Sequence, residues 1–125
     1  MNNLDKVKEF HEKFGQKISN SQTWDKDTAE RRVNLISEEY MEFLTGIKND
    51  DPVEVLDALI DLTYVVLGSA IEMGFSDKFQ KGFDEVHASN MSKLGEDGEP
   101  IYREDGKVLK GPNYVRPDLK KVLQG

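Results

Sequence analysis

The sequence predicts an all-α fold, with a four-helix bundle-like core and a C-terminal hairpin or loop extension. Apolar residues recur at helical spacing in four segments between residues 3 and 94, and short polar stretches separate these segments. Residues 95–125 lack this period and contain two Asp-Gly pairs, which are typical of turns. A chain of 125 residues is long enough for one core and too short for two. We therefore expect a single domain over residues 1–125, with a helical core at about 3–94 and a tail at about 95–125.

The first helix is expected from Leu4 to Phe14. Its apolar residues follow a helical period, and Gly15 can end the helix. Residues 16–27 have no such period and are predicted to form a loop, in which Trp24 could close over a ligand or stack on a base.

A second helix should begin near Asp27 or Thr28 and continue to about Ile47. Its apolar residues recur at intervals of three and four, which places them along one stripe of the helix. The stripe contains Val33, Ile36, Tyr40, Phe43, Leu44 and Ile47. The polar run KNDD that follows predicts a short turn.

The third helix has the clearest start signal. Asp51 is a favourable N-cap residue, Pro52 suits the first helical position, and Glu54 could complete a capping-box-like arrangement. The helix should end near Gly74. Because its residues are apolar almost all round, we expect most of the helix to be buried.

The last helices are predicted from weaker signals. Ser76 is expected to cap a fourth helix that ends before Gly95. The tail then holds short strand-like segments around its Asp-Gly pairs, which predicts a hairpin or an ordered loop. Pro117 could begin one last turn of helix that reaches Leu123.

Two aspartates interrupt the apolar sequence of the third helix. Asp57 and Asp61 are four residues apart and share one face, where like charges destabilise a helix unless a positive charge lies between them. If the helix is buried, so are these side chains, and buried acids are usually paired, protonated or bound to metal. A bound cation is the simplest remedy.

The second helix offers two glutamates that could complete such a site. If the second and third helices pack antiparallel across the KNDD turn, Glu39 should lie level with Asp61, and Glu42 level with Asp57. Carboxylate oxygens without histidine or cysteine favour a hard cation, so Mg²⁺ is the expected cofactor and Mn²⁺ a second possibility.

Simpler interpretations stay open for these residues. Acidic residues on a helix more often form a solvated face than a set of ligands, and this applies to Glu38, Glu39 and Glu42. The aspartates could instead form salt bridges with Arg31 or Arg32. Glu54 could serve only as a capping residue.

Two other kinds of metal site are disfavoured. A di-iron bundle needs an inward Glu-x-x-His motif on each of two helices, and only Asp84 and His87 resemble that motif, once. The loop spacing of an EF-hand is absent as well. The Asp-Gly pairs of the tail are therefore interpreted as turns.

Composition limits the possible partners and the compartment. Cysteine is absent, so the chain has neither a disulfide framework nor a thiolate metal site. The charged N-terminus does not resemble a signal peptide, and no apolar stretch is long enough to cross a bilayer. A net charge of −7 argues against binding nucleic acid. We expect a soluble, cytoplasmic protein with no membrane partner.

The charge is unevenly distributed along the chain. Residues 1–92 contain 10 basic and 18 acidic residues, whereas residues 93–125 contain 7 basic and 6 acidic residues. An acidic body with a slightly basic tail suits a metal site whose further ligand is an anion.

The acidic motifs resemble those of the all-α nucleoside triphosphate pyrophosphohydrolase superfamily, which includes MazG-like and phosphoribosyl-ATP pyrophosphohydrolase-like enzymes. The superfamily pattern is Glu-Glu-x-x-Glu on one helix and Glu-x-x-Asp on the next. Residues 38–42 match the first part fully. In the second part Asp61 fits the motif aspartate by its flanking sequence, which leaves Ala58 at the glutamate position and Asp57 beside it as a substitute. Glu54 and Asp57 fit the letters in a second register.

The resemblance covers about residues 30–117 and continues through EVHASNMSKLG and DGKVLKGPNY. It implies hydrolysis of a (deoxy)nucleoside triphosphate to the monophosphate and pyrophosphate. It also implies Glu39, Glu42, Asp57 and Asp61 as metal ligands, and Glu38 and Glu39 as catalytic residues, with Glu38 either a further ligand or the base for water. The residues implied in substrate binding are Asn90, Lys93, Lys107, Lys110 and Tyr114.

The tail would then cover the nucleotide, although its lysines could equally serve only to keep the tail soluble. Superfamily members associate, so a homodimer is expected and a tetramer is possible.

Two rival functions remain. A non-catalytic nucleotide or magnesium sensor is suggested by Ala58, and would release no pyrophosphate. A helical adaptor would bind a basic partner and show no saturable heat with Mg²⁺ or Mn²⁺.

Overall fold

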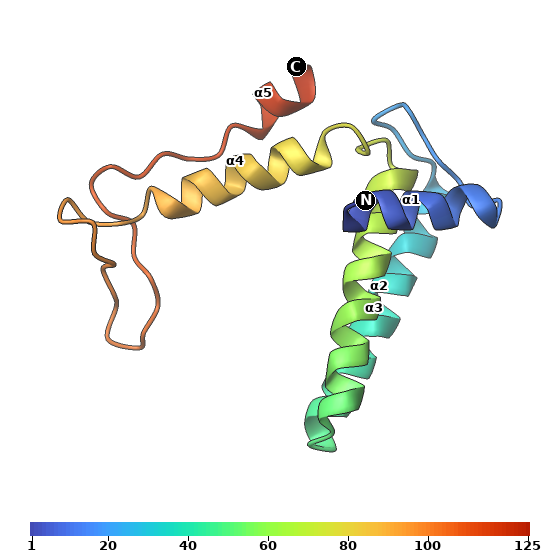
Figure 1. Cartoon of the computed structure of the whole chain (residues 1–125), viewed down its shortest axis with the longest axis horizontal. Coiled ribbons are helices and arrows are strands. Elements are labelled where there is room, and N and C mark those ends of the chain that lie inside the picture. Colours follow the sequence, from blue (N-terminus) through green and yellow to red (C-terminus); the bar gives the residue numbers. More distant parts are fainter. The chain divides into compact units, whose positions relative to one another are not determined.

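The computed structural model describes residues 1–125, which form five helices and no strand (Figure 1). The helices are α1 (Asn3–Lys13), α2 (Lys26–Lys48), α3 (Pro52–Glu72), α4 (Phe79–Met91) and α5 (Leu119–Gln124). The predicted all-α class is confirmed. The chain divides into two compact units, Met1–Ser76 with α1 to α3 and Asp77–Gly125 with α4 and α5.

Short polar side chains begin the first three helices, close to the predicted positions. Asn2 and Asp5 form a reciprocal capping box on α1. The Asp25 carboxylate accepts the backbone N–H of Thr28 on α2. The Asp51 carboxylate accepts two backbone N–H groups at the start of α3, where Pro52 needs no partner.

The start of α4 differs from the prediction. Ser76 does not cap this helix, because α4 begins three residues later at Phe79 and its N-cap residue Lys78 makes no side-chain cap bond. The Ser76 hydroxyl is instead buried without a hydrogen-bond partner. The N-cap preference of serine was therefore a misleading signal at this position.

In the first unit, α2 and α3 lie side by side and antiparallel (Figure 1). Near the turn the helices approach closely at Gly46, where a Cβ atom would lie 3.1 Å from the backbone nitrogen of Val55. The turn itself uses Asp50 in the left-handed conformation, with φ 48°. A side chain at residue 46 would require α3 to give way by a few tenths of an ångström, so glycine suits this close approach.

At the other end of the pair, buried charges connect the two helices. The Glu72 side chain is fully buried at the end of α3 and accepts hydrogen bonds from Arg31 Nη2 at 2.6 Å and Arg32 Nη1 at 2.7 Å. Arg32 also donates from Nε to Ser69 Oγ at 3.0 Å and from Nη2 to the Val65 carbonyl oxygen at 2.8 Å. One guanidinium group of α2 thus binds three residues of α3.

Helix α1 packs on α3 beside these charges. Val7 and His11 are its buried residues, and His11 Nδ1 hydrogen-bonds the Lys17 carbonyl oxygen. Gly68 makes room for this packing, since a Cβ atom there would lie 2.7 Å from Arg32 Nη2 and 3.1 Å from His11 Nε2.

The predicted burial of α3 holds for only part of the helix. Residues 67–72 are buried, but earlier apolar residues are exposed in the single chain, Val53 by 78% and Leu56 by 59%. Asp57 is exposed and Asp61 is half-buried, so the expectation that both are buried was wrong. One face of α3 meets α2 and α1 packs against its C-terminal part, so an all-round apolar sequence is left partly uncovered.

The second unit contains the predicted ordered loop. An isolated antiparallel bridge joins Tyr102 to Val108, and the chain then returns to the end of α4. The Gly111 N–H donates to the Lys93 carbonyl oxygen at 2.8 Å, and a Cβ atom at Gly111 would lie 2.3 Å from the Leu94 carbonyl oxygen. This glycine therefore allows the tail to pass directly over the end of the helix.

Candidate metal centre

Three carboxylates from two helices meet in the first unit. Glu39 and Glu42 belong to α2 and Asp61 belongs to α3, and one oxygen from each lies within 4.8 Å of the others. Glu39 and Asp61 are half-buried, and Glu42 is exposed. The group is therefore open to solvent on one side.

Helix geometry brings these groups together. Glu39 and Glu42 are three residues apart and share a face of α2. On α3, Ala58 is only 2% exposed and lies one turn before Asp61. Because residues three apart share a helix face, Asp61 lies on the side of α3 that carries this buried alanine.

The mutual repulsion of the acids changes their protonation. Burial raises the pKa of Glu39 to about 6, and the hydrogen bond and charge of Glu42 and the charges of Asp61 and Asp57 add to this rise. Burial also raises the pKa of Asp61, with further contributions from Asp57 and Glu42. Without a cation, the group holds its negative charge at a cost.

The polar partners of the group are incomplete. Glu39 Oε2 is buried and has no hydrogen-bond partner. Arg31 and Arg32 do not form the alternative salt bridges with Asp57 or Asp61, because both pair with Glu72. The donor set consists of carboxylate oxygens alone, which suits a hard divalent cation, and the three residues could hold a metal ion.

Three other predicted or candidate acids lie nearby in the sequence but outside this group. Asp57 is exposed, although it is close enough to affect the pKa values of Glu39 and Asp61. Glu38 is exposed on α2, and Glu54 is half-buried in the first turn of α3.

The sequence predictions missed Glu72, a fully buried acid that pairs with Arg31 and Arg32. It lies eleven residues after Asp61, which is close to three helical turns, and so falls on nearly the same face of α3. Two adjacent arginines on α2 were the signal that could have found it, since a buried acid at the end of an apolar helix needs such partners.

Similarity to known proteins shows the family of this chain. The family model for phosphoribosyl-ATP pyrophosphohydrolase matches residues 7–90, which include all three carboxylates. The chain belongs to this family. Family membership supports pyrophosphohydrolase activity and implies a nucleotide substrate. None of the curated proteins compared with the chain matches it.

One solved structure similar to the chain is the crystal structure of a putative NTP pyrophosphohydrolase from Exiguobacterium sp. 255-15. The two chains are 27% identical, and the alignment covers 99% of this chain and 93% of the other, with a TM-score of 0.47. None of the five helices of this chain is both long and apolar enough to span a membrane.

The predicted substrate-binding residues lie in the second unit. Lys110 Nζ lies 4.7 Å from the centroid of the Tyr114 ring, a cation–π contact. Lys93 is distant from these two residues in the sequence, but its carbonyl oxygen accepts the N–H of Gly111, which places its backbone near them. Asn90 at the end of α4 and Lys107 in the loop are exposed. The structure therefore brings Lys93, Lys110 and Tyr114 to one end of this unit.

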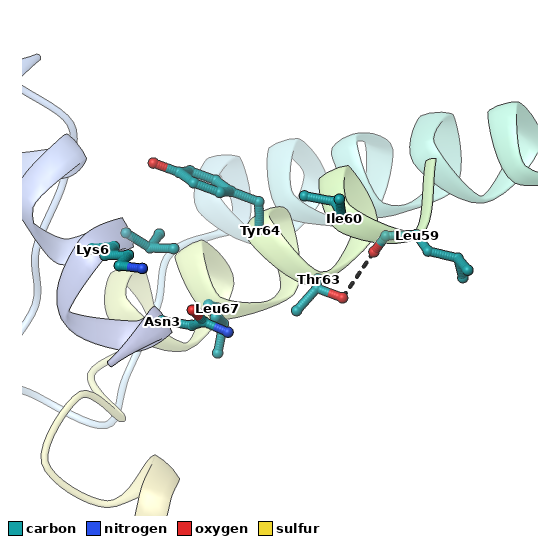
Figure 2. A pocket seen from close by; sticks show the side chains of 8 residues that line it. Asn3, Lys6, Leu59, Ile60, Thr63, Tyr64 and Leu67 are labelled. Carbon is teal, nitrogen blue, oxygen red and sulfur yellow. Dashed lines mark hydrogen bonds between the residues drawn. The ribbon is translucent and has the colours of Figure 1, made fainter. Parts of the chain in front are cut away.

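A hollow of about 340 Å³ lies between α1 and α3 and contains none of the predicted site residues (Figure 2). Its surface is mostly apolar, and Lys6 is its only charged residue. Tyr64 lines the hollow and packs edge-on against Phe10, with ring centroids 5.8 Å apart. The other lining residues are Asn3, Val7, Leu59, Ile60, Thr63 and Leu67.

The raised pKa of Glu39 predicts a pH-dependent contribution to stability. An unfolded glutamate has a pKa near 4.5, so the folded state binds the proton more tightly than the unfolded state does. Glu39 should therefore destabilise the metal-free protein increasingly as the pH rises from about 4.5 to about 6, and by a constant amount above that range.

Thermal unfolding of the wild type and of Glu39→Gln, followed by circular dichroism from pH 4.5 to 7.5 in the presence of a chelator, measures this contribution. The variant should gain in melting temperature relative to the wild type as the pH rises. Glu30→Gln is the matched control, because Glu30 is exposed and lies on the same helix. An equal difference at every pH would contradict the raised pKa.

Proposed function

We propose that this protein hydrolyses (deoxy)nucleoside triphosphates to the monophosphate and pyrophosphate with the help of Mg²⁺, or of Mn²⁺ in its place. The observation that carries the proposal is the meeting of Glu39, Glu42 and Asp61, with one buried glutamate oxygen left without a partner. Carboxylates held at such short separations are costly for the protein unless a cation relieves their repulsion. Nucleotide phosphates are then natural further ligands for that cation.

In this proposal Glu39, Glu42 and Asp61 hold the cation. When bound, the cation neutralises phosphate charge and lowers the pKa of a water molecule. Asp57 adds negative charge at the edge of the group and serves as a further ligand in place of the glutamate that the superfamily pattern would put at Ala58. Glu38 is either a further ligand or the base that takes the proton from the attacking water.

Replacing one carboxylate tests this assignment. Asp61→Asn should abolish Mg²⁺-dependent release of pyrophosphate, because the amide keeps the shape of the side chain but removes a charged ligand. The measurement is pyrophosphate release from a panel of canonical and damaged triphosphates with Mg²⁺ and with Mn²⁺. This panel also separates an enzyme from a non-catalytic sensor, and identifies the preferred base and sugar.

The control for this experiment is Asp84→Asn, which makes the same chemical change at an exposed residue of α4. Both variants should keep the helical circular dichroism of the wild type. Pyrophosphate release that survives in Asp61→Asn would refute the assignment of this aspartate.

We further propose that the tail binds the phosphates and the base of the substrate. Residues 93–125 contain 7 basic and 6 acidic residues, whereas the rest of the chain is strongly acidic, and this slight basic excess suits an anion. Lys93, Lys107 and Lys110 would contact phosphate oxygens, while Asn90 and Tyr114 would contact the nucleoside. The contact of Lys110 with Tyr114 supports this grouping, because it keeps a cation and an aromatic ring together.

The double variant Lys107→Ala/Lys110→Ala tests the role of the tail. It should raise the Michaelis constant for the triphosphate while leaving the melting temperature unchanged, since both lysines are exposed. Lys120→Ala is the control, because Lys120 lies in the same tail on α5 and is also exposed. A Michaelis constant equal to that of the wild type would favour a tail whose lysines act only through solubility.

We also propose that the protein is a homodimer, with a tetramer as a higher form, and that it acts in the cytoplasm. The exposed first half of α3 supports self-association, because Val53, Leu56 and Ile60 are each more than half exposed in the single chain. Exposed apolar surface of this extent is typical of protein interfaces.

Light scattering at micromolar concentration tests this proposal. The expected mass is twice the chain mass of 14.2 kDa. Ile60→Glu should shift the mass towards that of one chain without loss of helical structure, because Ile60 is already 54% exposed within the chain. A monomeric wild type would refute self-association.

A further inference from the structure

The Arg32 side chain lies in the same helix pair as the three carboxylates, at the end away from the turn. Arg32 precedes Glu39 by seven residues, close to two turns of α2. Its three partners on α3, Val65, Ser69 and Glu72, follow Asp61 by four, eight and eleven residues. The carboxylates therefore lie between this contact and the turn that joins the helices.

The two ends of the helix pair are held in different ways. Near the turn, the short connection and the close packing of Gly46 on α3 fix the register. At the far end, the guanidinium of Arg32 is almost fully buried, and binding to three residues across a span of α3 leaves it little freedom to slide or turn.

In the middle of the pair, electrostatic repulsion between carboxylates tends to separate α2 from α3. Three carboxylate oxygens within 4.8 Å of one another repel. The turn can resist this repulsion from one side only. A second fixed point is needed on the other side of the acids if α2 and α3 are to stay in register without a cation.

We propose that Arg32 is a positioning residue for the carboxylate group: its bonds to Val65, Ser69 and Glu72 hold α2 against α3 so that Glu39 and Asp61 stay converged for cation binding. This inference rests on the proposed function for its consequence, which is cation affinity. Its geometric part, the alignment of α2 with α3 beside Glu39 and Asp61, can be tested without any metal.

The neighbouring Arg31 provides a matched control. Both arginines bind Glu72 at nearly the same distance, but Arg31 is partly exposed and bonds Glu72 alone, whereas Arg32 also bonds Val65 and Ser69. Arg31→Lys and Arg32→Lys keep the positive charge beside Glu72. Only the second removes the fork of donors that reaches three residues of α3.

The geometric test uses cross-linking. The natural chain has no cysteine, so the pair Leu35→Cys/Val65→Cys provides the only two thiols. These residues lie one turn from Glu39 and Asp61 on the side of Arg32, so the pair leaves the three carboxylates and their repulsion in place. Arg32 bonds only the backbone oxygen of residue 65, which the substitution keeps. Short bifunctional methanethiosulfonate reagents should join them in the parent and in Arg31→Lys, and the cross-link should be lost in Arg32→Lys at a temperature where circular dichroism shows full helicity. If Arg32→Lys does not fold, Ser69→Ala decides by the same criterion. It removes the bond from Arg32 to Ser69 Oγ, together with the bond from Ser69 Oγ to the Val65 carbonyl oxygen, and keeps the ion pairs with Glu72.

The functional test is Mn²⁺ affinity, measured by calorimetry in proteins that keep Glu39 and Asp61. Arg32→Lys should weaken binding by about tenfold or more, the range typical of residues that orient metal ligands, while Arg31→Lys should not. A purely structural role would lower only the melting temperature and leave the affinity of the folded protein unchanged.

The outcomes separate the two proposals. Cross-linking that persists in a folded Arg32→Lys variant, or in Ser69→Ala where that variant decides, would overturn the inference. Unchanged Mn²⁺ affinity after loss of the cross-link would overturn it as well. If the wild type binds no Mn²⁺, the proposed function fails, and the cross-linking result still supports or overturns the positioning role of Arg32.

Discussion

The buried charge of Glu72 is the constraint on which the helix pair depends. A carboxylate that is fully removed from water is costly, and two guanidinium groups of α2 offset this cost with short hydrogen bonds. Because both arginines belong to one helix and the glutamate to another, the bond forms only when α2 and α3 are correctly aligned. Electrostatics thus specifies the arrangement of two helices that apolar packing alone would hold loosely.

The charges at the end of the α2–α3 pair differ from those at the carboxylate group in its middle. At the end of α3 the negative charge of Glu72 is paired with two guanidinium groups, and at the carboxylate group all charges are negative. The protein tolerates the unbalanced group because it is half open to solvent and because Glu39 binds a proton more readily than an ordinary glutamate does. An arrangement that is costly without a cation is well suited to binding one.

Small residues determine how close the helices come. Gly46 and Gly68 lie at points where backbone or guanidinium atoms of a neighbouring element leave little space. A small residue at each position makes few apolar contacts, but it lets the neighbouring element come close. The carboxylates of α2 and α3 can meet only because their helices approach closely here, so the site depends on residues that carry no chemistry themselves.

The helix starts were predictable from sequence because Asp51 and Pro52 act within one turn of their own backbone. The pairing of Glu39 with Asp61 was predictable too, since a short turn between antiparallel helices leaves little choice of register. The misleading signals were Ser76 as a cap and the all-round apolar character of α3 as evidence of burial. Capping depends on where the chain turns, and burial depends on how many neighbours a helix finds.

The sequence by itself determined the all-α class, the position of the helix pair and the approach of Glu39 and Asp61 across it, but it did not show that Asp57 lies outside the group. Only the tertiary structure decided that Arg31 and Arg32 bind Glu72 and leave the aspartates without a basic partner. The physical reason is distance. Caps, helical periods and short turns act between residues close in the chain, whereas the partner of an arginine forty residues away is chosen by how three helices pack.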